Sequence, residues 1–136
     1  MTEIIRPAQP GDETELTKMI HELAEFERAG ADCIVTENQL REALFGDHPT
    51  VYGHIAEADG QAAAGALWFR NFSTWDGVAG IYLEDLYVRP QFRRRGVYRQ
   101  LYQYLQKRAA EDARKCQRVV NLVGKIRASG GKDAAV

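Results

Sequence analysis

The sequence predicts an α/β fold, in which a sheet is flanked by helices. Three observations indicate it. Residues 80–102 begin as an apolar strand, pass through a basic loop that contains glycine, and continue with apolar side chains at helical spacing. Residues 51–70 alternate as two strands around Asp59-Gly60, a common hairpin turn. Residues 13–28 place apolar side chains at i, i+3, i+4 and i+7, which is typical of an amphipathic helix.

The first elements are a short strand over residues 4–7 and a helix over residues 13–28, for which Asp12 is the expected N-cap. One face of this helix is expected to join the core: Leu16, Met19, Ile20, Leu23 and Phe26. Residues Thr36 to Gln39 read as a capping box, which predicts a second helix that ends before Pro49.

The hairpin continues through a loop over residues 71–77 into the central strand, residues 80–88, after which Pro90 breaks the strand ladder. A long helix is expected from about Arg94 to Cys116. One of its faces carries Val97, Leu101, Tyr104, Leu105 and Arg108. A further strand is expected over residues 119–123, and residues 124–136 are expected to be disordered. One domain is thus expected over residues 1–118, followed by this strand and tail.

Charge is unevenly distributed along the 136 residues, although the net charge is only -1. Residues 1–88 carry five Lys or Arg against sixteen Asp or Glu, and residues 89–118 carry ten against two. We call these regions the acidic lobe and the basic band. Together they indicate a site for an anionic cofactor beside one for a cationic substrate. Nucleic acid could also bind the basic band, but the acidic lobe would repel a long polyanion, so a compact anion fits better.

Several classes of protein are disfavoured. The N-terminal residues lack a signal-peptide pattern and no apolar run approaches the length of a membrane span, so we expect a cytoplasmic protein without a membrane partner. Cys33 and Cys116 form no motif and suit a reducing compartment. The three histidines, His21, His48 and His54, lack the spacing of metal ligands, so no metal is expected.

The strand–loop–helix stretch can bind a phosphate group. Backbone N–H groups in the loop and the first helical turn have no partner within the helix, so they can bind an anion. Four arginines add positive charge at the same place: Arg93, Arg94, Arg95 and Arg99. The stretch therefore predicts a pyrophosphate cradle, and the alternative is a solvated basic turn.

The same stretch resembles the acetyl-CoA signature of the GNAT superfamily of N-acetyltransferases. The resemblance rests on Leu83-Glu84-Asp85-Leu86-Tyr87-Val88, on Pro90 and on Arg93-Arg94-Arg95-Gly96-Val97. The family signature is Q/R-x-x-G-x-G/A, in which Arg93 fills the first position and Gly96 the first glycine. Tyr98 departs from the final Gly/Ala, where a ring would crowd the phosphates. The Leu-Glu-Asp-Leu-Tyr-Val strand is similar to that of diamine (spermidine/spermine) acetyltransferases.

The resemblance implies a GNAT fold, with a mixed, mostly antiparallel sheet, and an enzyme that moves an acetyl group from acetyl-CoA to a small cationic amine in a ternary complex. The amine would be polyamine-like or thialysine-like. It further implies cofactor contacts from Leu86, Tyr87, Val88, Arg93, Arg94, Arg95, Gly96, Val97, Tyr98 and Arg99. The acceptor side would include Phe26, Glu27, Trp75, Glu84 and Asp85.

Glu84 is the catalytic candidate, because a carboxylate beside the site can take the proton of an ammonium group. Strand alternation predicts that Glu84 and Asp85 point to opposite faces. A backbone N–H near Leu86 would polarise the thioester carbonyl.

The recognisable resemblance covers residues 1 to about 108. The family continues with a helix, closing strands and a tyrosine that acts as general acid, none of which is recognisable here. The expectation is therefore a C-terminal third that is missing or replaced, by truncation or by a change of reading frame. Two alternatives to an active enzyme stay open: a non-catalytic CoA-binding remnant, and a nucleic-acid binder that uses Arg93 to Arg95. The resemblance also implies a homodimer.

Overall fold

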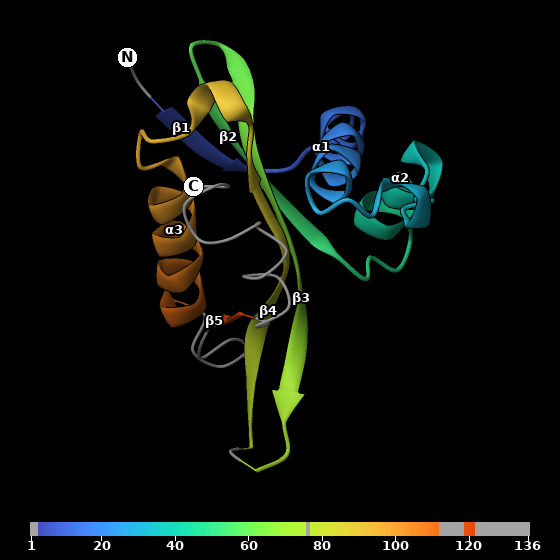
Figure 1. Ribbon diagram of the computed structural model, residues 1–136. Coiled ribbons are helices and arrows are strands. Elements are labelled where there is room, and N and C mark those ends of the chain that lie inside the picture. The colour runs from blue at the N-terminus through green and yellow to red at the C-terminus, as the bar shows by residue number, and fades with distance from the viewer. Residues whose placement is uncertain (1–2, 76, 112–118, 122–136) are drawn as a thin grey trace.

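A computed structural model describes residues 3–75, 77–111 and 119–121 (Figure 1). The strands are β1 (Glu3–Pro7), β2 (Tyr52–Ala58), β3 (Gln61–Ser73), β4 (Val78–Val88) and β5 (Val119–Asn121). The α-helices are α1 (Glu13–Phe26), α2 (Glu37–Phe45) and α3 (Val97–Glu111). Two short 3-10 helices, η1 (Gly30–Asp32) and η2 (Pro90–Phe92), lie in the connections.

The strands form one sheet in the order β1-β2-β3-β4-β5. Neighbouring strands are antiparallel from β1 to β4, and β5 is parallel to β4. The predicted mixed, mostly antiparallel sheet is therefore confirmed. Helices α1 and α2 cover one face of the sheet and α3 covers the other (Figure 1).

Each face of the sheet has its own buried cluster. The cluster beneath α3 includes Trp68, Leu83, Leu86 and Val88 of the sheet with Val97, Leu101, Leu105 and Ala109 of α3. The cluster beneath α1 and α2 includes Leu16, Met19, Leu23, Leu40 and Leu44 with Ile55, Leu67 and Tyr87 of the sheet. Most side chains that the apolar spacing placed on the core faces of the helices are thus buried or partly buried. Arg108, which was expected on the same face of α3 as Leu101 and Leu105, is exposed.

Two predicted local signals are confirmed. The turn between β2 and β3 places Asp59 at φ 54° and Gly60 at φ 74°, the left-handed pair that a two-residue hairpin loop requires. At the start of α2, the Gln39 N–H donates to the Thr36 hydroxyl, and the Gln39 side chain accepts from the Thr36 N–H. These reciprocal bonds are the capping box.

Asp12 is the N-cap residue of α1, as predicted, but its side chain makes no capping hydrogen bond. Its carboxylate instead accepts two hydrogen bonds from Arg6, of 2.7 and 3.1 Å, and one from the Gln9 N–H. The Glu13 carboxylate accepts from the Gly11 N–H in the same turn, and Arg41 of α2 donates to it. The Arg6 guanidinium on β1 therefore binds the carboxylate that was expected to accept from the first N–H groups of α1.

Other predicted boundaries shift by a few residues. Helix α1 ends at Phe26, because Arg28 takes a left-handed φ of 61°. Helix α3 begins at Val97 rather than Arg94, because Arg94 and Gly96 have φ values of 66° and 77°. The expected fifth strand is present over Val119–Asn121. The expected helix end at residues 112–116 and the expected tail at 124–136 lie outside the described residues.

Candidate functional site

The central strand β4 contains a bulge at the predicted base. Leu67 of β3 pairs with Asp85, and the next residue, Trp68, pairs with Leu83. Glu84 therefore has no counterpart on β3, and two residues of β4 occupy the space of one. A bulge bends the strand and redirects its side chains at this point.

The bulge interrupts the regular alternation on which the prediction for Glu84 and Asp85 was based. Leu83 and Leu86 both lie in the cluster beneath α3, although three positions apart an alternating strand would place them on opposite faces. Asp85 and Tyr87 line a small apolar hollow under α1, on the other face. Alternation therefore fails between Leu83 and Leu86, and opposite faces for Glu84 and Asp85 stay a prediction.

Among the described residues, a strand covers only part of the far edge of β4. β5 pairs with Ile81, Tyr82 and Leu83. From Glu84 to Val88, no strand in the described part of the chain pairs with this edge. Backbone N–H and C=O groups that point to an uncovered edge can bind an extended ligand. The uncovered stretch includes Leu86, where the oxyanion donor is predicted.

The loop between η2 and α3 has the backbone geometry of an anion site. Arg94 and Gly96 take left-handed φ values of 66° and 77° on either side of Arg95. A Cβ placed on Gly96 would meet no atom within 4 Å, so the space in front of this glycine is open. The first N–H groups of α3 have no partner within the helix and carry its positive dipole end.

The four predicted cradle arginines do not act as one group. Arg95 lies 3.2 Å from the Asp59 carboxylate and stacks on the Phe92 ring. Arg94 and Arg99 are exposed, and among the described residues neither has an ionic partner. Within the described part of the chain, these two arginines offer charge at the loop that is both exposed and without a carboxylate partner.

Arg93 turns inward, away from its predicted role in the cradle. Its Nε donates to the Val88 carbonyl at 2.8 Å. Its guanidinium carbon lies 5.1 Å from the centre of the Phe26 ring and 5.4 Å from that of Tyr87. The structure thus brings together Arg93 from the predicted cofactor side and Phe26 from the predicted acceptor side.

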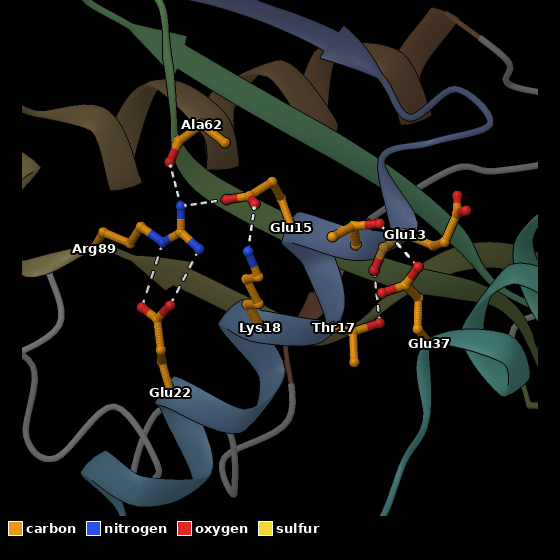
Figure 2. Close-up of polar contacts among 9 residues, drawn as sticks. Glu13, Glu15, Thr17, Lys18, Glu22, Glu37, Ala62 and Arg89 are labelled. Carbon is orange, nitrogen blue, oxygen red and sulfur yellow. Dashed lines mark hydrogen bonds and ion pairs between the residues drawn. The ribbon is translucent and has the colours of Figure 1, made fainter.

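Sequence reasoning missed Arg89, which joins α1 to the end of β4 (Figure 2). Its guanidinium donates to Glu15 at 2.7 Å, to the two Glu22 oxygens at 3.1 and 3.4 Å, and to the Ala62 carbonyl at 3.1 Å. Hydrogen bonding to Arg89 holds the pKa of the Glu15 carboxyl below its usual value. The available signal was an arginine directly after a buried strand, opposite the acidic residues of the first helix.

Tyr87 lies next to this network. Its ring is only 5% exposed, and burial raises the pKa of its phenol, with a further rise from the negative charge of Glu22. Of the two rings that Arg93 contacts, that of Tyr87 therefore belongs to a buried residue next to the Arg89 ion pairs.

The other predicted acceptor residues are spread out. Glu27 is the exposed C-cap residue of α1, directly after Phe26. Trp75 is 97% exposed in the turn between β3 and β4. That hairpin extends away from α1 and α2 (Figure 1).

Tyr98, which departs from the family signature, lies in the first turn of α3. Its ring is half-buried and packs against the cluster beneath α3, and burial raises the pKa of its phenol. Together with Arg99 and Tyr102 it lines an open groove along α3.

His54 is a buried residue of β2. It is 1% exposed, and its Nδ1 accepts a hydrogen bond from the Trp68 indole at 3.1 Å. Burial, helped by the positive charge of Arg108, lowers its pKa to about 4. No group of three or more potential metal ligands occurs among the described residues. No helix in the described ranges is long and apolar enough to cross a bilayer.

Comparison with known proteins identifies the family. Residues 16–128 match the model of the acetyltransferase (GNAT) family. This range continues past residue 108, where the recognisable resemblance was expected to end, and includes β5. The chain is 40% identical over 96 residues to a thialysine N-epsilon-acetyltransferase of Caenorhabditis elegans, which covers 71% of this chain and 58% of the relative. It is also 34% identical over 100 residues to the human spermidine/spermine N(1)-acetyltransferase-like protein 1, which covers 68% of this chain and 14% of that protein.

Solved structures support the same fold. A possible acetyltransferase from Clostridium difficile superimposes with a TM-score of 0.73 at 19% identity, over 96% of this chain and 85% of that one. An aminoglycoside N-acetyltransferase in complex with CoA superimposes with a TM-score of 0.65 at 20% identity, over 95% and 82% of the two chains. The chain thus spans somewhat more than half the length of its thialysine acetyltransferase relative. On the family match, the sequence identity and the shared fold, this chain belongs to the GNAT acetyltransferase family.

Proposed function

We propose that this chain is the core of an N-acetyltransferase that moves an acetyl group from acetyl-CoA to a small cationic amine, polyamine-like or thialysine-like. The observation that carries the proposal is the bulged end of β4, which no described strand covers beyond Leu83 and which leads through a left-handed loop into α3 in a chain of this family. This arrangement provides an edge for an extended ligand and a helix start for its phosphates.

The described residues fit a CoA phosphate group. The open space in front of Gly96, the free N–H groups at the start of α3 and the unneutralised Arg94 and Arg99 all favour a compact anion at this loop. The backbone of Leu86, Tyr87 and Val88 would hold the extended arm of the cofactor along the uncovered edge.

The acceptor is proposed to be a cationic amine because the acidic lobe precedes the basic band in the chain and includes the carboxylates of α1 and α2. Phe26 supplies an aromatic face and Glu27 a carboxylate at the end of α1. Thialysine and polyamines, the compounds for which the two relatives are named, are both small amines of this kind.

The proposed reaction is direct transfer. The amine nitrogen attacks the thioester carbonyl carbon, its proton passes to Glu84 directly or through water, and the carbon–sulfur bond breaks as the amide forms. The departing CoA sulfur takes up a proton. A Leu86 N–H at the uncovered edge would stabilise the negative charge that develops on the carbonyl oxygen. Amines of this type have pKa values of about 10, so a base is needed at neutral pH.

Two measurements test the proposal. Calorimetry with acetyl-CoA should show binding, and a thiol-release assay over polyamines, thialysine and short peptides should show turnover with a small amine. Binding without thiol release would favour a non-catalytic remnant. If acetyl-CoA did not bind but a fluorescent oligonucleotide did, the nucleic-acid alternative would replace the proposal.

A further inference from the structure

The Arg93 side chain lies between two parts of the chain that the proposed function assigns to different ligands. It is the first residue after η2 and directly precedes the left-handed Arg94 of the cofactor loop. Its guanidinium is within 5.1 Å of the Phe26 ring, at the end of α1, where the acceptor is proposed to bind. It therefore contacts the acceptor side while its backbone belongs to the cofactor side.

The two rings around Arg93 differ in how they are held. Tyr87 is buried on β4 beside Glu22, which Arg89 fixes through two hydrogen bonds. Phe26 is the last residue of α1, and the chain turns at Arg28 with φ 61°. A shift of the guanidinium would therefore be transmitted to Phe26 more readily than to Tyr87.

The hydrogen bonding of Arg93 is not that of a residue selected for stability alone. Nε donates to the Val88 carbonyl, but the Nη2 atom is buried without a hydrogen-bond partner. A buried donor without a partner costs free energy, and an apolar side chain between two aromatic rings would avoid that cost. The planar cation in this place calls for a role beyond packing.

We infer that Arg93 is a positioning residue that couples acceptor binding to cofactor binding, an inference that rests on the proposed function. When phosphates order the loop at Arg94 and Gly96, the Arg93 guanidinium is fixed between its two rings and fixes Phe26 in turn. Coupling between two sites is reciprocal at equilibrium, so a bound acceptor should also tighten the binding of CoA.

The test measures the Kd of CoA by calorimetry with and without saturating thialysine. CoA carries no acetyl group, so no turnover disturbs the equilibrium. In the wild-type chain we expect thialysine to lower the Kd of CoA about fivefold or more. Arg93→Lys keeps the charge but loses the planar group that stacks on both rings. In this variant the Kd of CoA should therefore be the same with and without thialysine. In steady-state assays the same variant should raise the KM for thialysine and change kcat little.

Arg70→Lys is the matched control. The Arg70 guanidinium stacks on the Tyr52 and Trp68 rings at 5.1 and 5.5 Å, on the exposed side of the α3 cluster. Arg70→Lys thus loses the same type of contact but leaves Phe26 unaffected. The coupling between thialysine and CoA binding should therefore survive in this variant.

Variants of Phe26 provide a second readout if Arg93→Lys folds poorly. Phe26→Leu removes the aromatic face and should abolish the coupling, whereas Phe26→Tyr retains that face and should preserve it. Coupling that persists in Arg93→Lys or Phe26→Leu, or that disappears equally in Arg70→Lys, overturns the inference. CoA binding by the wild-type chain without any coupling overturns this inference alone. An absence of CoA binding overturns it together with the proposed function.

Discussion

Arg95 Nη1 lies 3.2 Å from Asp59 Oδ2, so an arginine of the cofactor loop is paired with the turn between β2 and β3. Arg94 and Arg99 lack such a partner among the described residues. The three arginines all belong to the basic band, yet they are not equivalent as ligands for an anion.

The first prediction follows from this difference. Arg94→Ala and Arg99→Ala should each weaken CoA binding by roughly three- to tenfold, because each removes an unneutralised charge beside the phosphates. Arg95→Ala should weaken it less, since its charge is already shared with Asp59. Calorimetry at two salt concentrations measures this, and higher salt should weaken the wild-type complex. Lys107→Ala, on the exposed part of α3, is the control. An equal loss of CoA affinity in all three arginine variants would contradict the distinction between Arg95 and the other two.

The second prediction concerns the stability of variants at the two left-handed residues of the loop, Arg94 and Gly96. Arg94→Gly should raise the free energy of unfolding by about 1 kcal/mol, because glycine adopts φ 66° without the Cβ penalty. Gly96→Ala should lower it by about 1 kcal/mol for the same reason, although its Cβ would meet no neighbour. Urea unfolding of both variants gives the comparison, and changes of the same sign in both would refute it.

A third prediction concerns Tyr98. Its ring packs against the cluster beneath α3, so Tyr98→Gly should lower the free energy of unfolding by about 1 kcal/mol or more, from lost packing together with lost helix propensity. CoA affinity should stay within about twofold if the ring leaves the phosphate space clear, a change of under ~0.5 kcal/mol. A clear gain in CoA affinity would instead mean that the ring crowds the phosphates.

The carboxylates of the acceptor side give a fourth prediction. Glu84→Gln should lower kcat by about 100-fold or more, because it removes the proton acceptor and keeps the shape. Glu27→Gln should leave kcat nearly intact and raise the acceptor KM by only about two- to fivefold, since Glu27 is exposed and solvent screens its charge. Thiol-release assays measure both constants, with Glu42→Gln on α2 as control. If Glu84→Gln retains full turnover at neutral pH, Glu84 is a structural carboxylate.

His54 gives a prediction for stability against pH. Its folded pKa is about 4, below the ordinary 6.5, so the unfolded chain binds the proton more readily between these values. Its contribution to stability is therefore complete above pH 6.5 and is lost as pH falls towards 4, by roughly 3 kcal/mol in all. His54→Asn keeps an acceptor for the Trp68 indole and should flatten this part of the stability curve. Urea unfolding from pH 4 to 7 provides the measurement, and an unchanged slope would contradict it.

Much of the fold follows from local sequence signals. The Thr36 capping box, the Asp59-Gly60 turn and the apolar spacing of α1 and α3 are local, and the structure contains all of them. The capping bond of the Asp12 side chain was wrongly expected because its actual partner, Arg6, lies outside the helix and outside the sequence pattern that defines a cap.

The site was less predictable because its geometry depends on distant residues. Alternating apolar residues cannot reveal that Glu84 is an extra residue, since the bulge is defined by pairing with β3. The direction of each arginine depends on partners such as Asp59, Glu22 and Val88, which no spacing rule connects to the basic band. The place of Trp75 depends on the length by which β3 and β4 extend beyond the helices.

The order of the strands in the sheet has a consequence for how the chain acquires its structure. Each strand is hydrogen-bonded to its neighbour in sequence, so the hairpins β2–β3 and β3–β4 can form as soon as their residues leave the ribosome. β1 must wait until α1 and α2 have been made, and the Glu15–Arg89 pair spans 74 residues of chain. Because long loops close late, we expect docking of α1 to be the slow step of folding, which pulsed hydrogen exchange would detect as late protection of its amides.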